Sequence, residues 1–497
     1  MDRHPSARAI HDGLGHPVID ADGHYVEFGP SILEYLREVA GERVADALKR
    51  PNDWVGNTIR MTPAQRREAG IAQEAFWVIP AKNTLDRATA ILPRLLYERL
   101  DELGFDFTVL YPSAGLLVTP IEDEELRRAT CRAFNRYVAD QYRAYADRIT
   151  PAAVIPMHTP AEAIEELEYA VGTLGLKAAM LGHPIRRPIP EVQSKQPDAV
   201  RWARWIDTFG IDSAYDYDPV WQKCLELRVA PSFHAGSRSF GYRASPSNFT
   251  YNHIGHFAAA LEALCKSIFL AGVTRRFPQL RLAFLEGGVA WACALYSDLI
   301  GHWKKRNRTA LEEVNPANLD RARFRDLLER YGGKQLADRY TANDVKLEAF
   351  DTPRPPAVQE LDDFAACDIK RADEIRDLFT PNFYFGCEAD DPLNAWATRA
   401  GANPYGARLK TLLGSDIGHF DVVNMAEVLG EAYELVEDGL ISEADLRDFL
   451  FANPAQFFCA ANPDFFTGTA VEGAVRELLA IPATGGQSNP VVDRKRA

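Results

Sequence analysis

Side chains that bind metal ions alternate along the stretch VIDADGHYVE, residues 18–27. Asp20, Asp22 and His24 stand at every second position directly after an apolar start, PVI. Because successive side chains of a β-strand point to opposite faces, residues two apart point the same way. We therefore expect Asp22 and His24 to face one side of a strand end, with Asp20 deeper on that side. An imidazole and a carboxylate together suit Zn, Mn or Fe.

Further acidic and histidine side chains follow other short apolar runs. They are His234 in SFHAG, His253 and His256 in YNHIGHF, Glu286 in FLEGG, Glu388 at the end of NFYFGCE, and Asp416 and His419 in LLGSDIGH. Each pattern alone also fits a structural role, such as a buried histidine with a satisfied hydrogen bond or a common loop. Their coincidence after separate apolar runs indicates a shared site. The spacing in YNHIGHF predicts two histidines on one helix face.

Eight short apolar or aromatic runs alternate with longer helical patterns along the chain. The expected strands cover residues 16–24, 106–112, 149–157, 176–182, 229–236, 280–288, 382–388 and 409–419, and helical patterns cover 88–104, 122–148, 160–175 and 218–228. Near-continuously apolar strands separated by helices indicate a parallel sheet buried on both faces. Eight such units predict an α/β fold, a (β/α)8 TIM barrel. Chemistry in this fold sits at the C-terminal strand ends, where the candidate donors stand.

Three segments interrupt this strand–helix rhythm, at about residues 51–90, 183–218 and 307–377. Long excursions from a compact domain are usually lids, interfaces or surface additions. We expect one metal-dependent barrel domain over residues 15–470 with these insertions, and a C-terminal tail at 471–497. A chain of 497 residues also admits a two-domain arrangement.

The composition is that of an ordinary globular chain, with 46% hydrophobic and 25% charged residues. A net charge of −14 argues against nucleic acid as a partner. Seven cysteines without CxxC spacing favour reduced thiols, and no apolar stretch of membrane-spanning length or secretory signal occurs. We therefore expect a cytoplasmic protein that contacts no membrane. No dinucleotide fingerprint, phosphate-binding loop or GxSxG elbow is present, so the expected partner is a small-molecule substrate.

Several stretches of the sequence resemble the amidohydrolase-related family, the branch of the amidohydrolase superfamily that includes aminocarboxymuconate-semialdehyde decarboxylase and γ-resorcylate decarboxylase. The resemblance covers most of the chain and is carried by VIDADGHYVE, NTLDRATAILPRLLYERLDELGFDFTVLYPS, FPQLRLAFLEGGVAW, LLGSDIGHFD and the closing NPAQFF. It implies a metal-bearing barrel with ligands from strands one, five and eight. The matching positions are Asp22, His24, His234 and Asp416.

Two positions depart from the family pattern that this resemblance implies. Asp22 stands where the family has His or Glu, which makes the site more anionic and favours Mn or Fe over Zn. Glu286 stands where the family usually carries a histidine that serves as a base or orients the substrate. A carboxylate can act as a general acid or base when its pKa is tuned, or can bind metal itself.

The first functional hypothesis is non-redox chemistry at one divalent ion held by Asp22, His24, His234 and Asp416. The ion would polarise a carbonyl or carboxylate or activate water, and Glu286 would move the proton. His256 and His419 are further catalytic candidates. The reaction would be hydrolysis or decarboxylation of a small carboxylated or cyclic molecule. Arg187, Arg201, Arg204 or Arg243 could bind a substrate carboxylate.

Two other hypotheses remain open at this point. The surplus donors His253, His256, Glu286, Glu388 and His419 could hold a second metal ion. The protein would then be a dinuclear Mn/Fe or di-iron oxygenase that hydroxylates a small molecule, as some relatives of the resembled family do. Alternatively, the chain is a non-catalytic partner subunit of such an enzyme. Long insertions and apolar helix faces predict a homo-oligomer or pairing with a related subunit.

Overall fold

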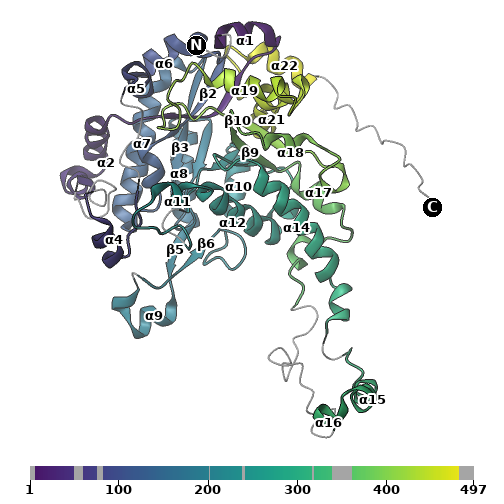
Figure 1. Ribbon diagram of the computed structural model, residues 1–497. Coiled ribbons are helices and arrows are strands. Elements are labelled where there is room, and N and C mark those ends of the chain that lie inside the picture. Colours follow the sequence, from purple (N-terminus) through teal and green to yellow (C-terminus); the bar gives the residue numbers. More distant parts are fainter. Residues whose placement is uncertain are drawn as a thin grey trace.

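Eight strands of the computed structural model form one parallel sheet that curves into a barrel (Figure 1). They are β1 (Ile19–Tyr25), β2 (Phe107–Pro112), β3 (Ile149–Ile155), β4 (Ala178–Leu181), β7 (Pro231–Phe233), β8 (Leu282–Phe284), β9 (Phe383–Glu388) and β10 (Lys410–Gly414). The strand order is β1-β2-β3-β4-β7-β8-β9-β10, and each hydrogen-bonded pair is parallel. The eight predicted strands and the TIM-barrel fold are confirmed.

The structure describes residues 6–49, 60–74, 82–200, 202–237, 241–315, 318–337 and 361–480. Arg201, parts of the first and third predicted insertions, and residues 481–497 of the predicted tail lie outside these ranges. The rest of the predicted tail forms α22 (Glu472–Ala480), in which Val475 is buried. The domain boundaries at residues 15 and 470 stay a prediction.

The first and last strands meet at the seam of the barrel. The His24 N–H donates to the Ile417 carbonyl (2.8 Å), and the Asp416 N–H donates to the Asp22 carbonyl (3.1 Å). The loop after β10 approaches β1 so closely that a Cβ at Gly418 would lie 2.5 Å from the His24 carbonyl oxygen. Gly418 has φ +95°, a conformation that side chains disfavour. The seam therefore places the residues after β10 directly beside the end of β1.

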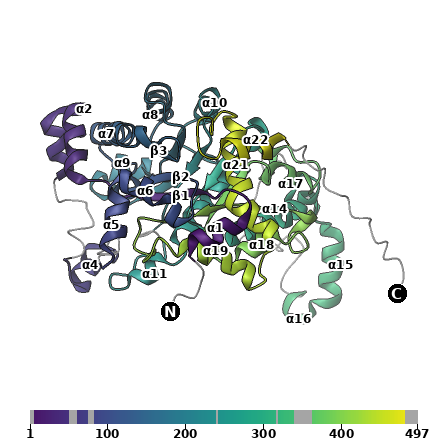
Figure 2. The same ribbon diagram turned by 90° about the horizontal axis from the view of Figure 1, so that it is seen from above.

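Helices surround the sheet, as the view from above shows (Figure 2). They are α1 (Ala7–Leu14), α2 (Gly29–Lys49), α4 (Pro63–Ala69), α5 (Thr84–Ile91), α6 (Pro93–Leu103), α7 (Glu124–Tyr142), α8 (Pro160–Leu167), α10 (Asp218–Glu226), α11 (Phe249–His253), α12 (His256–Leu270), α13 (Val273–Arg276), α14 (Ala290–Arg306), α17 (Glu374–Phe379), α18 (Asn394–Thr398), α19 (Val428–Glu437), α20 (Glu443–Arg447) and α21 (Asn453–Ala461). The predicted helix at 88–104 is two helices. Leu92 is extended because Pro93 disfavours a helical conformation in the residue before it.

Phenylalanine rings on neighbouring strands pack in a row between the sheet and the helices. Phe233, Phe284 and Phe385 are paired in register across β7, β8 and β9, with ring centroids 5.7 and 6.1 Å apart. Phe284 also contacts Trp291 of α14, so this face of the strands points toward the helices. Burying each ring contributes roughly 1.5–3 kcal/mol. Because side chains alternate along a strand, His234 next to Phe233 points to the barrel interior.

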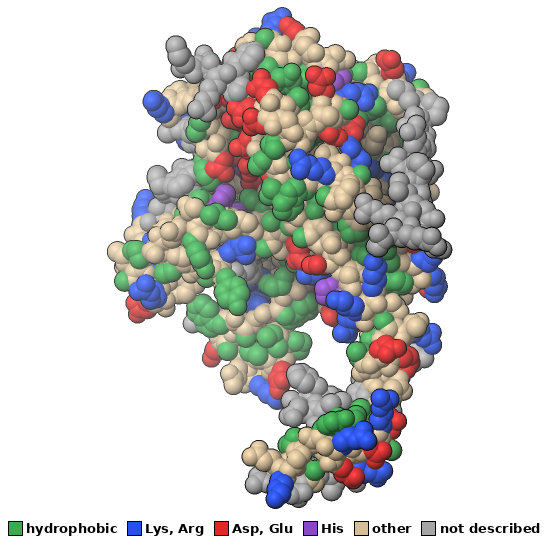
Figure 3. All heavy atoms as spheres, turned by 45° about the vertical axis from the view of Figure 1, so that its right-hand side comes forward, with side chains coloured by type: hydrophobic (Ala, Val, Ile, Leu, Met, Phe, Trp, Pro, Cys, Tyr) green, Lys and Arg blue, Asp and Glu red, His purple; other side chains and the backbone are tan. Residues whose placement is uncertain are grey.

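The predicted insertions at 183–218 and 307–377 carry their own elements. The insertion at 183–218 contains α9 (Pro190–Lys195) and the antiparallel strands β5 (Ile185–Pro188) and β6 (Arg204–Asp207). The insertion at 307–377 contains α15 (Arg321–Tyr331) and α16 (Gly333–Leu336), which project away from the barrel (Figures 1 and 3). In the described ranges, none of the helices combines the length and the apolar character needed to span a bilayer.

Candidate metal centre

Two donors come from β1, as the alternation of its side chains predicts. Asp22 and His24 are both buried, and His24 Nε2 lies 3.7 Å from Asp22 Oδ1. His24 Nδ1 lies 3.3 Å from the Pro112 carbonyl oxygen. If Nδ1 carries the proton and donates it to that carbonyl, Nε2 presents a lone pair toward Asp22. Such an arrangement of one imidazole is typical of a metal ligand.

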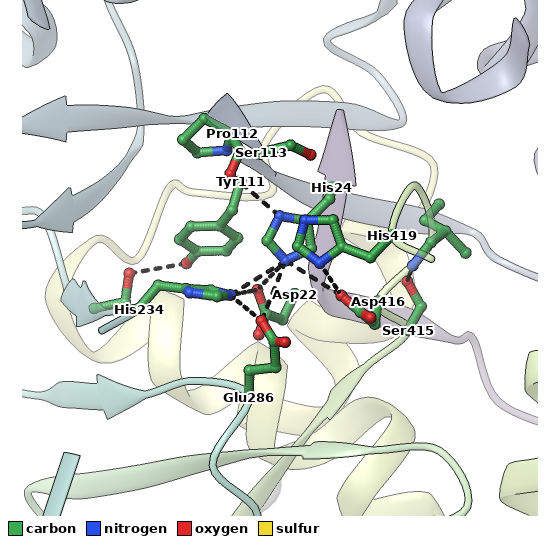
Figure 4. Close-up of polar contacts among 12 residues, drawn as sticks. Asp22, His24, Tyr111, Pro112, Ser113, His234, Glu286, Ser415, Asp416 and His419 are labelled. Carbon is green, nitrogen blue, oxygen red and sulfur yellow. Dashed lines mark hydrogen bonds and ion pairs between the residues drawn. The ribbon is translucent and has the colours of Figure 1, made fainter. Parts of the chain in front are cut away.

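Two further donors follow the neighbouring strands β7 and β8. His234 Nε2 lies 3.2 Å from His24 Nε2 and 2.6 Å from Glu286 Oε2. Glu286 Oε2 is also 3.8 Å from His24 Nε2. The three side chains thus meet at the C-terminal strand ends, where the fold places chemistry. Glu286 stands two residues after the last residue of β8 and turns its carboxylate into the barrel mouth (Figure 4).

The loop after β10 supplies the last two donors. Asp416 Oδ1 lies 3.5 Å from His24 Nε2 and 2.6 Å from His419 Nδ1. The His419 ring stacks on the His24 ring with centroids 3.7 Å apart. Asp416 and Glu286 both have positive φ, +49° and +62°. Such a backbone costs about 1–3 kcal/mol in a residue with a side chain and persists where the surroundings enforce it, often at functional sites.

These six residues form what we call the donor cluster: Asp22, His24, His234, Glu286, Asp416 and His419 (Figure 4). They contain two groups whose donor atoms lie within 4.8 Å of one another. One group joins Asp22, His24 and His234, and the other joins His24 to Glu286, Asp416 and His419. The structure therefore brings together the four ligands expected from the sequence, and it places Glu286 and His419, which were expected to be catalytic or second-metal residues, beside them. Their role as ligands stays a prediction.

Burial and mutual repulsion act on the charges of the donor cluster. Burial, followed by repulsion from Asp416, raises the pKa of Asp22 well above its ordinary value. The same two causes, with repulsion from Asp22, raise the pKa of Glu286. Burial, followed by the proximity of His419, lowers the pKa of His24 and of His234. Without a cation, the cluster therefore favours neutral carboxyl groups and neutral imidazoles. A bound cation would favour the ionised carboxylates.

Unsatisfied buried oxygens test whether a cation fits. Among the described residues, Asp22 Oδ1 and Asp416 Oδ2 are buried and accept no hydrogen bond. A buried carboxylate oxygen without a donor is costly, and a cation would relieve that cost. The two Nε2 atoms at 3.2 Å face the same space. The donor set of the cluster, imidazoles and carboxylates, suits a divalent ion such as Mn, Fe or Zn.

Asp20 lies beneath the donor cluster and accepts four hydrogen bonds. The Thr108 hydroxyl (2.6 Å) and the Ser415 hydroxyl (2.8 Å) donate to its Oδ2, and the Ser415 and Asp22 N–H groups donate to its Oδ1. Asp20 therefore ties β1, β2 and the loop that carries Asp416 into one network. Burial raises the pKa of Asp20 to about 6, and these hydrogen bonds oppose the rise. The sequence showed its parity with Asp22 but gave no sign of its partners.

A cavity of about 220 Å³ opens beside the donor cluster. Glu286, Glu388, His253, His256 and Asp391 are among its lining residues. Burial, followed by repulsion from Asp416, raises the pKa of Glu388 to about 8. Glu388 nevertheless has solvent-exposed surface. The donor atoms of His253, His256 and Glu388 do not join either close group of the cluster among the described residues.

The prediction that His253 and His256 share one helix face is wrong. His253 ends α11, and α12 begins at His256 after Gly255, whose φ of +67° breaks the helix. The two rings still lie 4.8 Å apart, and both line the cavity. Asp391 was missed as a cavity residue. It stands in EADD just after β9, and the Asp391 N–H donates to the Glu388 carbonyl in a tight turn.

The candidate arginines are engaged inside the insertion or lie at the cavity rim. Arg187 donates to Asp207 (2.9 Å), to the His158 carbonyl and to the Tyr217 hydroxyl. Arg204 donates to Glu122 (3.0 Å) and to two backbone carbonyls. Arg243 donates to the carbonyl of Ile254, a cavity residue, at 3.4 Å. Of the three that the structure describes, only Arg243 is therefore placed where it could meet a ligand in the cavity.

Comparison with known proteins finds one family model and several solved structures that are similar to this chain. Similar solved structures include a dihydroxybenzoic acid decarboxylase from Polaromonas sp. JS666 with bound manganese and 2-nitroresorcinol, 17% identical with a TM-score of 0.48 over 89% of this chain and 97% of that one. An amidohydrolase from Mycobacterium avium subsp. paratuberculosis K-10 is 17% identical with a TM-score of 0.49, over 89% and 99%. The 5-carboxyvanillate decarboxylase from Sphingomonas paucimobilis is 14% identical with a TM-score of 0.48, over 89% and 98%. A sequence model described as Amidohydrolase matches residues 19–336, more than half of the chain, and the chain therefore belongs to this amidohydrolase family.

Proposed function

We propose that the chain is a divalent-metal-dependent hydrolase of a small molecule. Asp22, His24, His234 and Asp416 would hold the cation. The observation that supports this most is the 3.2 Å separation of the His24 and His234 Nε2 atoms beside buried, unsatisfied carboxylate oxygens. Membership of the amidohydrolase family supports the same reading.

Hydrolysis is favoured over decarboxylation by the walls of the cavity. Its described lining contains the carboxyls of Glu286, Glu388 and Asp391 and contains neither lysine nor arginine. A substrate carboxylate would meet acidic side chains there and would depend for binding on the metal ion and on Arg243 at the rim. A neutral carbonyl or amide group would meet no such penalty.

The protein side chains would divide the reaction between them. A bound divalent cation supplies Lewis acidity, which polarises a carbonyl group and activates water. Glu286 lies between the donor cluster and the cavity, so its carboxylate can accept a proton from water and return it to the leaving group. His419, stacked on His24 and paired with Asp416, would orient both ligands. His256 would line the substrate side of the site.

Metal content and turnover test this proposal together. Elemental analysis of the purified chain should find about one divalent ion per chain, and His234→Ala should reduce it several-fold. His302→Ala is the matched control, because His302 is an exposed histidine of α14. A panel of small amides, esters and carboxylic acids would then identify the reaction. Release of CO2 without hydrolysis would show a decarboxylase instead, and a chain that never binds metal would overturn the proposal and favour a non-catalytic subunit.

A dinuclear oxygenase is the second candidate. The donor cluster offers six side chains in two groups that share His24, more than one ion needs. Two ions per chain with iron among them, and oxygen uptake in the presence of a reductant, would support this candidate over the hydrolase. One ion without oxygen uptake would exclude it.

A further inference from the structure

The cavity beside the donor cluster is lined by several acidic side chains. Three of its lining side chains are carboxylates, those of Glu286, Glu388 and Asp391, and the lining found in the described residues includes no basic side chain. With Asp22 and Asp416 next to it, five carboxyl groups surround the place where a substrate would bind. A bound cation would favour the ionised form of these carboxyl groups, and one divalent cation would balance two of their charges.

The acidic groups are brought together by the backbone on both sides of the cavity. Glu388 and Asp391 belong to one tight turn, closed by the Asp391 N–H and the Glu388 carbonyl at 3.3 Å. On the facing loop, a Cβ at Gly288 would lie 2.7 Å from Asp391 Oδ2. Gly288 therefore lets Asp391 approach the loop of Glu286, which a larger residue would prevent.

Glu286 belongs to the donor cluster and also lines the cavity, so it joins the two. Its side chain is only 6% exposed, lines the cavity, and carries an oxygen, Oε2, that accepts no hydrogen bond of good geometry among the described residues. His234 Nε2 lies 2.6 Å from this oxygen. A buried carboxylate oxygen left in this state is expensive unless a positive or hydrogen-bond-donating group meets it.

An aromatic wall completes the cavity. The Phe257 ring lines it and packs against the His256 ring at 3.9 Å and the His234 ring at 5.2 Å. The face of an aromatic ring attracts cations as well as apolar groups. Carboxylates on one side and an aromatic face on another are the surroundings that an organic ammonium group prefers.

We propose that the substrate carries a protonated amine, which binds in this cavity between Glu388, Asp391 and the Phe257 ring. This inference rests on the proposed function, because it places the reacting carbonyl at the donor cluster and the amine beside it. The substrate class is thus a small amine-bearing molecule rather than a carboxylic acid. Two other occupants are possible outcomes of the test: a second metal ion at Glu286 and Glu388, and an anion that reaches Arg243 at the rim.

Three probes of the same shape separate these occupants. Benzylammonium, benzyl alcohol and benzoate would be titrated into the metal-loaded chain at pH 7 by calorimetry. We expect benzylammonium to bind about tenfold more tightly than benzyl alcohol. Glu388→Gln should weaken benzylammonium about tenfold and leave benzyl alcohol within about twofold, with metal content unchanged. Asp391→Asn is the second variant, since it keeps the oxygen that accepts from the Leu393 N–H.

Arg243→Gln is the matched control and should leave benzylammonium binding unchanged. Tightest binding of benzoate, weakened by Arg243→Gln, would overturn the proposal in favour of an anionic substrate. A fall from two metal ions per chain to one in Glu388→Gln would overturn it in favour of a second metal site. Loss of all metal binding would instead contradict the proposed function, so the two failures are distinguishable.

Discussion

The Nε2 atoms of His24 and His234 lie 3.2 Å apart although the residues are 210 positions apart in the sequence. Both rings are buried, and burial lowers the pKa of each. Two neutral imidazoles can present lone pairs to one cation at this separation, whereas two protonated rings would repel each other. The folded state should therefore gain stability from a bound divalent ion.

Removing the cation should destabilise the protein. A ligand present at 100 times its dissociation constant stabilises by about 2.7 kcal/mol, so we expect a chelator to lower Tm by several degrees. Calorimetry with and without Mn²⁺ measures the shift. In His234→Ala, Tm should respond little to either treatment. A wild-type Tm that changes with neither chelator nor added Mn²⁺ would count against a metal centre.

Replacing Asp20 should loosen both the barrel seam and the donor cluster. Asn at this position would turn a hydrogen-bond acceptor into a donor facing the Thr108 and Ser415 hydroxyls or the backbone N–H groups. We expect Asp20→Asn to lower the free energy of unfolding by about 2–4 kcal/mol and to weaken metal binding. Urea unfolding and metal titration measure the two effects. Thr108→Val, which removes a single donor, should cost only about 1 kcal/mol.

A side chain at Gly418 should disturb the loop that carries Asp416. The Cβ of alanine would lie 2.5 Å from the His24 carbonyl oxygen, and φ +95° adds strain. We expect Gly418→Ala to destabilise by more than about 2 kcal/mol and to reduce metal affinity. Gly439→Ala is the control, because φ is +67° there but nothing lies within 4 Å of the new Cβ. Equal effects of the two substitutions would show that the close approach at His24 has no importance.

The pair of His11 and Asp106 should make stability depend on pH. His11 Nε2 lies 2.7 Å from Asp106 Oδ2, and this hydrogen bond raises the pKa of His11 above 6.5. The pKa of Asp106 is lowered below 3.8: burial opposes the change, but the bonds from His11 and the Val18 N–H outweigh it. The stabilisation that comes from a raised histidine pKa is fully present below pH 6.5 and is lost as the pH rises through the pKa of the folded state. The stabilisation that comes from a lowered aspartate pKa is present above pH 3.8 and is lost as the pH falls through the pKa of the folded state.

The window for this pair therefore lies between about pH 4 and the raised pKa of His11. Within it, His11→Gln should lower the free energy of unfolding by about 1 kcal/mol, and the difference should shrink toward pH 9. Urea unfolding of both proteins at pH 5.5 and pH 9 measures this. A difference that grows with pH would contradict the assigned direction.

The eight strands were predictable because each is an apolar run buried on both faces, a pattern that does not depend on distant partners. The convergence of Asp22, His24, His234 and Asp416 followed from the rule that strand ends meet at one rim of a barrel. The break between His253 and His256 was not predictable, because it depends on the positive φ of Gly255. Nor could the sequence reveal the positive φ of Glu286, a buried residue of the donor cluster.

Asp391 shows a different limit. Its position shortly after β9 could be read from the sequence. However, only the turn that joins it to Glu388 and the space left by Gly288 place it in the cavity. The placement of Asp391 in the cavity thus depends on contacts between loops that follow different strands. The cytoplasmic location, the oligomeric state and the roles of the three insertions stay predictions.

The seam between β1 and β10 has a consequence for the order of events during synthesis. Asp22 emerges from the ribosome near the start of translation, whereas Asp416 follows almost four hundred residues later. At 5–20 residues per second, the first ligands wait for roughly 20–80 s before their last neighbour exists. Metal loading through all four proposed ligands is therefore a late step, reserved for chains that have been translated nearly to their end.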